Sequence, residues 1–244
     1  MLGLGVWRLA QGQETEQAVE WALEAGYRHI DTATFYRNER SVGAALRRSG
    51  IPREQMFVTT KWLPIRANPE EELKRSLDRL GLEYVDLYLI HWPLPGRMSR
   101  GWRAFESLLA QERARAIGVS NFDTDRLTWL LGVASRPPAV NQVHFSPLRF
   151  PRKLLAYCEE RGIVLEAYSP LEHGRAFGNP VIGEIAARLG RTEAQVMLRW
   201  AIQHDAVVIP KSARQDRIRE NARIFDFELS TSEMSELDAL SDRG

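Results

Sequence analysis

An aspartate and a tyrosine stand five residues apart in the stretch HIDTATFYRNE, which spans residues 29–39. His29 and Ile30 are typical of a buried strand end, and Asp31 follows them directly. Small residues then form a turn before Tyr36. A carboxylate and a phenol placed where a strand meets a loop can hold or move a proton, so this stretch is a candidate for acid–base chemistry.

Two further residues of proton-moving types, Lys61 and His91, end short runs later in the chain. If the strands that carry Asp31 and Lys61 are neighbours, the two side chains can form a buried ion pair. An ammonium next to Tyr36 would lower the pKa of the phenol from its ordinary value of about 10. His91 could hydrogen-bond a substrate oxygen, so the four residues would form a general acid aimed at a carbonyl.

Each of the four residues also has a purely structural explanation when it is taken alone. Asp31 could cap a helix, Lys61 could be a partly exposed end residue, and His91 could be a hydrogen-bonded core histidine. Tyr36 could be a surface packing residue. Only their joint occurrence at one end of adjacent strands favours the catalytic interpretation.

Eight short, largely apolar runs predict the strands that position these residues, and their composition is typical of parallel strands covered on both faces. They span residues 3–7, 28–31, 57–61, 85–91, 116–120, 140–143, 164–169 and 206–210. Amphipathic segments lie between them. Asn68, Thr192 and Ser230 are predicted helix caps, and Gly81 is a predicted helix end.

An open doubly wound sheet would also alternate strands and helices, but eight strands in a chain of this length favour a closed barrel. We therefore predict a single (β/α)₈ TIM barrel domain over residues 1–244. The longest interval between strands, residues 169–206, leaves room for an extra helix. In such a barrel the chemistry lies at the carboxyl ends of the strands, where the polar residues named above are found.

The overall composition is that of an ordinary globular protein and excludes several classes. The 244 residues include 33 basic and 32 acidic side chains, a net charge of +1, which predicts no nucleic-acid partner. The single cysteine, Cys158, rules out a disulfide within the chain and fits a reducing compartment. The absence of a signal peptide or a long apolar run predicts a cytoplasmic protein with no membrane partner.

Three motifs that would indicate other enzymes are incomplete. Gly3-x-Gly5 lacks the third glycine and the following helix of a dinucleotide-binding fingerprint. GVSNF around Ser120 lacks the second glycine of a nucleophile elbow. The five histidines show no metal-ligand spacing, which disfavours a metal-dependent hydrolase.

Eight motifs, taken together and in order, resemble the aldo-keto reductase family over nearly the whole chain. They are GLGVW, DTATFYRNE, TTKW, LYLIHWP, IGVSNF, NQV, EAYSPL and IPKS. The resemblance implies that Tyr36 is the general acid and base, with Asp31, Lys61 and His91 completing a catalytic tetrad. It implies the reduction of small-molecule aldehydes and ketones by a protein that is mostly monomeric in this family.

The same resemblance implies where a nicotinamide cofactor would bind. Ser120, Asn121 and Gln142 would hydrogen-bond the carboxamide, and Tyr168 would stack on the ring. Ser169 and Leu171 would follow the pyrophosphate. Asn121 could otherwise be a turn residue and Tyr168 a core aromatic.

The segment IPKSARQDRIREN is expected to hold the nucleotide tail. Lys211, Ser212 and Arg217 would surround a 2′-phosphate, and Glu220 and Asn221 would contact adenine. Two cations and a hydroxyl suit a phosphate dianion, whereas a free ribose needs no such charge, so we expect NADPH in preference to NADH. A basic helix face is the structural alternative. A nucleotide-binding regulatory or structural protein of the same fold is the functional one, since fold alone does not prove activity.

The chain also departs from the family pattern. We expect a shortened hairpin before the first strand and a shortened loop after the last helix, so either this is a minimal version or the true start lies upstream. The segment KWLPIRANPE is compressed as well. Because these loops supply pocket walls, Trp7, Trp62 and Trp92 are the predicted lining of a shallow, apolar and broadly tolerant substrate pocket.

Overall fold

The computed structural model describes residues 1–65, 68–94, 96 and 98–243. Part of the compressed segment, residues 66–67, and the terminal Gly244 therefore lie outside the described residues.

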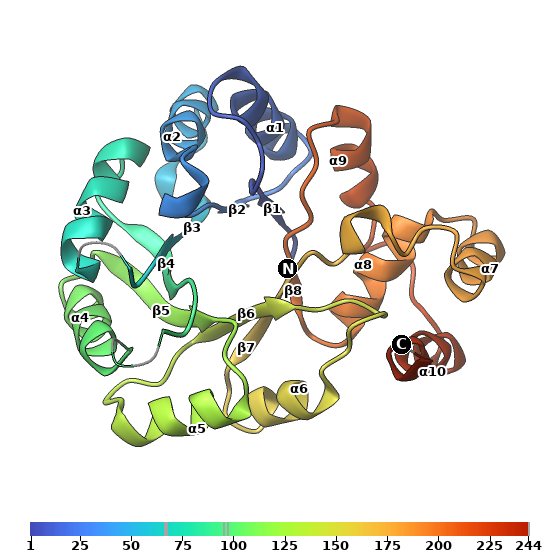
Figure 1. Cartoon of the computed structure of the whole chain (residues 1–244). Helices are drawn as coiled ribbons and strands as arrows, with labels where there is room; N and C mark the ends of the chain where they lie inside the picture. The colour runs from blue at the N-terminus through green and yellow to red at the C-terminus, as the bar shows by residue number, and fades with distance from the viewer. Residues whose placement is uncertain (66–67, 95, 97, 244) are drawn as a thin grey trace.

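Eight parallel strands form one sheet in which every strand pairs with the next one along the chain. The strands are β1 Gly3–Gly5, β2 His29–Asp31, β3 Phe57–Trp62, β4 Val85–Ile90, β5 Ala114–Ser120, β6 Val140–His144, β7 Val164–Tyr168 and β8 Val207–Val208. The sheet returns on itself, because Leu2 bridges to Val208 in parallel and the amide of Gly5 donates to the carbonyl of Pro210 over 3.2 Å. Helices surround the strands (Figure 1), which confirms the predicted (β/α)₈ barrel.

The helices alternate with the strands, as the sequence pattern predicts. They are α1 Gln13–Glu24, α2 Glu39–Arg48, α3 Pro69–Leu80, α4 Met98–Ala110, α5 Thr124–Val133, α6 Arg152–Glu159, α7 Pro180–Leu189, α8 Glu193–Gln203, α9 Gln215–Asn221 and α10 Thr231–Asp238. The extra helix expected between residues 169 and 206 is present, since α7 and α8 both lie in that interval.

Side-chain caps fix the predicted helix ends. Asn68 accepts a hydrogen bond from the amide of Glu71 at the start of α3, and Gly81 ends that helix in the left-handed conformation. Thr192 and Ser230 form complete capping boxes at the starts of α8 and α10. These caps satisfy backbone groups that the helices themselves leave unpaired, and so they set where each βα unit begins and ends.

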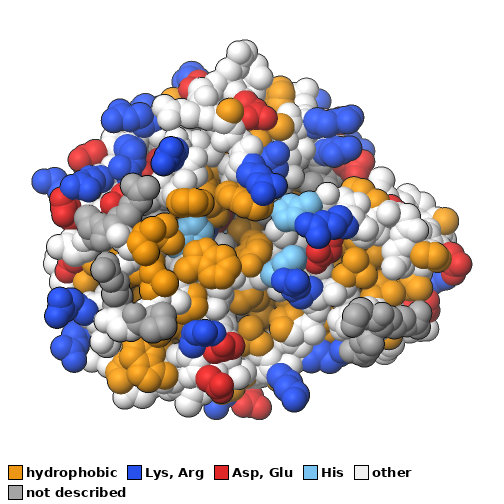
Figure 2. Space-filling model, in the orientation of Figure 1, with side chains coloured by type: hydrophobic (Ala, Val, Ile, Leu, Met, Phe, Trp, Pro, Cys, Tyr) orange, Lys and Arg blue, Asp and Glu red, His pale blue; other side chains and the backbone are white. Residues whose placement is uncertain are grey.

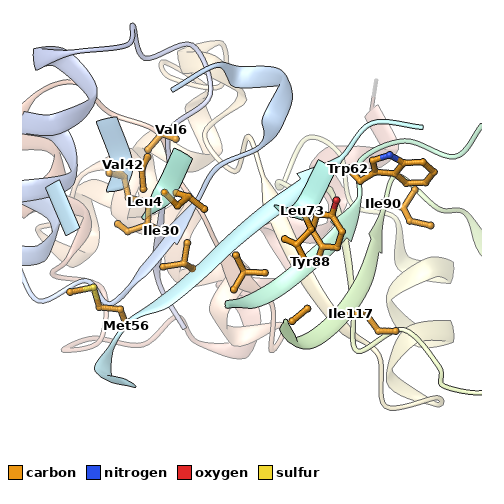
Figure 3. Close-up of a cluster of buried hydrophobic side chains, with 14 of the residues drawn as sticks. Leu4, Val6, Ile30, Val42, Met56, Trp62, Leu73, Tyr88, Ile90 and Ile117 are labelled. Atoms are coloured by element: carbon orange, nitrogen blue, oxygen red, sulfur yellow. The ribbon is translucent and has the colours of Figure 1, made fainter. Parts of the chain in front are cut away.

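Two apolar clusters lie between the strands and the helices. The first is built mainly from β1 to β5 and the helices beside them, and Figure 3 shows part of it. The second is built mainly from β6 to β8 with α7, α8 and α10. At one contact α2 and α3 approach so closely that a Cβ at Gly43 would lie 2.1 Å from the carbonyl oxygen of Leu80, so this position admits only glycine.

Candidate active site

A buried lysine joins Asp31 to Tyr36 at the carboxyl ends of β2 and β3. Lys61 Nζ donates to Asp31 Oδ1 over 2.6 Å, to the carbonyl oxygen of Thr32 over 3.1 Å and to the Tyr36 hydroxyl oxygen over 3.3 Å. Tyr36 is the last residue of a short 3₁₀ helix, Thr34–Tyr36, which turns the chain back over the strand that it leaves. The structure thus brings together the three residues that the sequence places on separate elements.

The ionic state of this group follows from burial and from the facing charges. Burial lowers the pKa of the Lys61 ammonium, but Asp31, Tyr36 and Glu166 together raise it by more, so the pKa is above its ordinary value and Lys61 stays charged. Burial raises the pKa of Tyr36, and the nearby Lys61 offsets only part of that rise, so the pKa is about 12. The sequence-based expectation of a lowered pKa for Tyr36 is therefore wrong in its net direction, because the loss of solvation outweighs the ammonium. At neutral pH the phenol holds its proton.

His91 follows β4 and lies beside Tyr36. The two rings are 5.6 Å apart between centroids and meet edge to face. Burial, assisted by the charge of Lys61, lowers the pKa of His91 to about 3, so the ring is neutral at physiological pH. Its Nδ1 atom is buried and has no hydrogen-bond partner among the described residues. A neutral imidazole carries one N–H, which makes His91 a candidate donor to a substrate oxygen.

A second group of polar side chains is connected by hydrogen bonds. It consists of Ser120, Asn121 and Tyr168. Asn121 has a left-handed backbone, with φ of 64°, and its amide nitrogen donates to the carbonyl oxygen of His91 and to Ser120 Oγ. Its amide oxygen accepts the Tyr168 hydroxyl proton over 2.8 Å. These bonds hold the asparagine and the tyrosine ring in fixed positions, which is what a site that orients a planar ring requires.

One cavity of about 940 Å³ connects these groups. It lies at the carboxyl ends of the strands, and its size is in the range of cofactor and ligand sites. Figure 2 shows hydrophobic side chains gathered around a hollow in the centre of this face, with basic side chains around them. Of the eighteen residues predicted from the sequence, those that line the cavity are Trp7, Asp31, Tyr36, His91, Trp92, Ser120, Asn121, Gln142, Tyr168, Ser169, Leu171, Lys211, Ser212, Arg217, Glu220 and Asn221.

Lys61 lies beneath the cavity without lining it, whereas Trp62 is placed elsewhere altogether. The Trp62 indole is 4% exposed and packs against Phe105, with a ring-centroid distance of 6.1 Å. Figure 3 shows it beside Ile90, its register partner on β4. Its prediction as a substrate-pocket residue is wrong, because successive side chains of a strand point to opposite faces and Lys61 takes the inward one.

The far end of the cavity carries cations in position for an anionic group. Lys211 and Arg217 are exposed and line the cavity, and among the described residues no ion pair joins either side chain to an acidic one. The nearby Arg214 is paired with Asp216 over 2.5 Å. Ser212 is buried, and its hydroxyl accepts the backbone N–H of Arg214 over 3.0 Å. The residues present therefore fit a phosphate-bearing nucleotide, with two unpaired cations at one end and an oriented aromatic ring at the other.

The described part of the chain has neither a cluster of metal-binding side chains nor a membrane-spanning helix. It contains no group of three or more His, Cys, Asp or Glu side chains placed to hold a metal ion. None of its helices combines the length and the apolar character needed to cross a bilayer.

Comparison with known proteins decides the family. The model of the family described as "Aldo/keto reductase family" matches residues 1–242. The chain belongs to this family. Its catalytic class is therefore that of oxidoreductases acting on carbonyl compounds, and solved members of the family bind NADP(H).

Relatives within the aldo/keto reductase family match almost the whole chain. A 9,11-endoperoxide prostaglandin H2 reductase of Trypanosoma cruzi is 48% identical over 99% of this chain and 87% of its own length. A glyoxal reductase of Bacillus subtilis is 46% identical over 98% of this chain and 88% of its own length. The crystal structure of an aldo/keto reductase from Brucella melitensis superposes with a TM-score of 0.94 at 41% identity, covering 98% of this chain and 94% of that one.

Several residues of this aldo/keto reductase site are not found by reading strand ends. Phe35 lines the cavity from the 3₁₀ helix Thr34–Tyr36, and Phe177 lines it from a loop. His173 also lines the cavity and contacts Trp7, with ring centroids 5.7 Å apart. Glu166 lies inside the barrel beneath the cavity and is 2% exposed. A glutamate in the middle of the otherwise apolar strand VLEAY is the signal that could have identified it.

Proposed function

We propose that this protein reduces aldehydes and ketones to alcohols with NADPH as the preferred cofactor, and that Tyr36 is the general acid. The observation that carries the proposal is the contact of one buried ammonium, Lys61 Nζ, with both the Asp31 carboxylate and the Tyr36 hydroxyl at the cavity floor. The residues around the cavity fit a nicotinamide nucleotide. When bound, that cofactor supplies the hydride to the carbonyl carbon.

The chain's own residues account for the proton. Because burial holds the pKa of Tyr36 at about 12, the phenol is protonated at neutral pH and can give its proton to the oxygen that gains charge. Lys61 then stabilises the phenolate that remains, and Asp31 keeps Lys61 charged and in place. His91, neutral and next to Tyr36, donates a hydrogen bond that orients the oxygen.

The substrate class is better supported than any one substrate. Relatives with similar identity carry the names glyoxal reductase, prostaglandin H2 reductase and morphine 6-dehydrogenase, which differ widely in substrate size. Exposed aromatic side chains at the cavity, Trp7, Phe35 and Trp92, support an open apolar pocket with broad tolerance. A pocket that makes only hydrophobic contacts rarely discriminates between similar substrates by more than about a hundredfold in kcat/KM.

We further propose that residues 1–244 act as one catalytic domain, as a monomer in the cytoplasm. The single cysteine, Cys158, is a buried free thiol, which is compatible with a reducing compartment.

The deciding experiment is consumption of NADPH by the purified protein with a panel of aldehydes and ketones, run beside Tyr36→Phe. We expect turnover by the wild type and a loss of at least about a hundredfold in the variant, with NADPH binding unchanged. Wild-type turnover that survives in Tyr36→Phe would refute the assignment of the acid. Tight NADPH binding without turnover by either protein would instead favour the nucleotide-binding regulatory module.

A further inference from the structure

Four polar side chains form a layer inside the barrel, directly beneath the cavity. Asp31 comes from β2, Lys61 from β3, Gln142 from β6 and Glu166 from β7, and all four are at most 2% exposed. Asp31 and Lys61 have roles in the proposed reaction. Glu166 has none so far, although it sits beside Gln142 in the register of β6 and β7.

The amide of Gln142 is held between two carboxyl groups. Its nitrogen donates to Asp31 Oδ2 over 2.8 Å and to Glu166 Oε1 over 2.5 Å. The reversed amide would place its oxygen against the Asp31 carboxylate and would lose the N–H bond to Glu166 Oε1, so both side chains favour the observed orientation.

This orientation decides what Gln142 can offer to a ligand. A primary amide has two N–H hydrogens and one carbonyl oxygen, and both hydrogens are used inside the barrel. The remaining polar atom is Oε1, for which the structure gives no donor among the described residues. Gln142 lines the cavity next to its register partner Ser120, so it presents an acceptor there and not a donor.

We propose that Glu166 is a positioning residue that acts through Gln142, making the barrel present a hydrogen-bond acceptor to the amino group of the nicotinamide carboxamide. The inference rests on the proposed function, since it requires a nicotinamide nucleotide in the cavity. The role needs a group that accepts an N–H without placing a second full negative charge beside Asp31. Burial and the charge of Asp31 raise the pKa of Glu166 to about 8, so Glu166 meets this requirement at neutral pH.

A binding experiment with two nucleotides tests the proposal directly. The oxidised 3-acetylpyridine analogue of NADP+ replaces the amino group of the carboxamide by a methyl group and so removes the donor. Dissociation constants for NADP+ and for this analogue would be measured by calorimetry for the wild type and for Glu166→Met, which keeps the chain length without an acceptor. We expect the wild type to prefer NADP+ by about tenfold, the effect of one hydrogen bond, and the variant to lose most of that preference.

Matched variants separate positioning from a general loss of structure. Glu166→Gln keeps a carbonyl oxygen that can accept the N–H of Gln142, so we expect it to retain the preference. Leu165→Ala alters the neighbouring buried residue of β7, which packs in the second apolar cluster, and should leave the ratio of the two constants unchanged. If Glu166→Met does not fold, Glu166→Thr, whose shorter side chain cannot reach Gln142, must show the same loss.

The outcomes distinguish this proposal from the one on which it rests. An unchanged preference in Glu166→Met and Glu166→Thr, with a wild type that binds NADP+, would overturn the role of Glu166 and leave the reductase assignment intact. A wild type that binds neither nucleotide would overturn both.

Discussion

Lys61 donates a hydrogen bond to the hydroxyl of Tyr36 over 3.3 Å and also lies 4.9 Å from the centroid of the same ring. The ammonium is fully buried and is fixed by Asp31, so its charge is present before any substrate arrives. It therefore opposes the effect of burial on the phenol, which by itself would make the phenolate still harder to form. The balance leaves Tyr36 a proton donor at neutral pH.

The role of Lys61 can be tested by removing its charge. Because Lys61 lowers the pKa of Tyr36, we expect Lys61→Met to raise that pKa further and to impair alcohol oxidation, which needs the phenolate, more than carbonyl reduction. Reduction should fall by about a hundredfold or more. The measurement is the ratio of the rate of alcohol oxidation to the rate of carbonyl reduction at pH 9, compared between the wild type and Lys61→Met. Lys61→Met combined with Asp31→Asn avoids an unpaired buried carboxylate, and Lys74→Met on the exposed face of α3 is the control. Equal losses in both directions would show that Lys61 does not tune Tyr36.

The preference for NADPH is predicted to depend on Lys211 and Arg217. Replacing both by alanine should weaken NADPH binding by about tenfold for each cation that is lost, because each provides a charge-assisted contact to phosphate. Binding of NADH, which has no 2′-phosphate, should change little. Arg219→Ala, on the same helix as Arg217, is the matched control, since the Arg219 side chain faces Glu24 at 3.7 Å. Equal losses for NADPH and NADH would contradict the phosphate assignment.

Alanine substitutions of Trp62 and Phe35 should have opposite effects on stability and on KM. Trp62 is 4% exposed in the first apolar cluster, so Trp62→Ala should lower the free energy of unfolding by about 3–5 kcal/mol. Phe35 is 52% exposed at the cavity, so Phe35→Ala should raise KM for apolar aldehydes several-fold and leave stability nearly unchanged. Urea unfolding and steady-state kinetics on both variants check this. A raised KM with unchanged stability for Trp62→Ala would show that Trp62 contacts the substrate after all.

Glu166 should make stability depend on pH. Its pKa in the folded protein is about 8, raised by burial from the ordinary value of 4.5, so between these values the folded state binds more protons than the unfolded chain. The contribution of Glu166 is therefore fully present below about pH 4.5 and is lost as the pH rises toward 8, by about 1.4 kcal/mol per pH unit.

The measurement is the difference in unfolding free energy between the wild type and Glu166→Gln at pH 5, 6.5 and 8. We expect this difference to shift steadily against the wild type across the series. Glu184→Gln on the exposed side of α7 is the control. Parallel curves for the wild type and Glu166→Gln would show that Glu166 ionises alike in the folded and unfolded states.

The barrel could be predicted from the sequence because its signals are local. Period, caps and chain length determine the strands and helices, and Asn68 and Thr192 act as the sequence indicates. The outward direction of the Trp62 side chain could also have been predicted, because successive side chains of a strand alternate between faces and Lys61 points inward. The position of Phe35 could not be predicted in this way, because it lies in a short 3₁₀ helix with no periodic apolar pattern.

The protonation states and pairing of the site residues were harder to predict from the sequence than the positions of these residues. The pKa of Tyr36 depends on how completely the fold removes its hydroxyl from water, and no local pattern reports that. The pairing of Glu166 with Gln142 depends on the register of β6 and β7, which sequence order alone does not provide. The predicted proximity of Asp31, Tyr36, Lys61 and His91 is therefore present in the structure, whereas the acidity of Tyr36 and the acidic residue beneath the site were missed.

The division of the core into two apolar clusters has a consequence for how the molecule unfolds. Few side chains contact both clusters, among them Leu2 and Leu154, so each cluster can act as a separate cooperative unit in native-state opening. Tyr36 packs against the first cluster, whereas Leu171, which also lines the cavity, packs against the second. A nucleotide bound between them would link the two units, and the apparent cooperativity of unfolding would rise with its concentration.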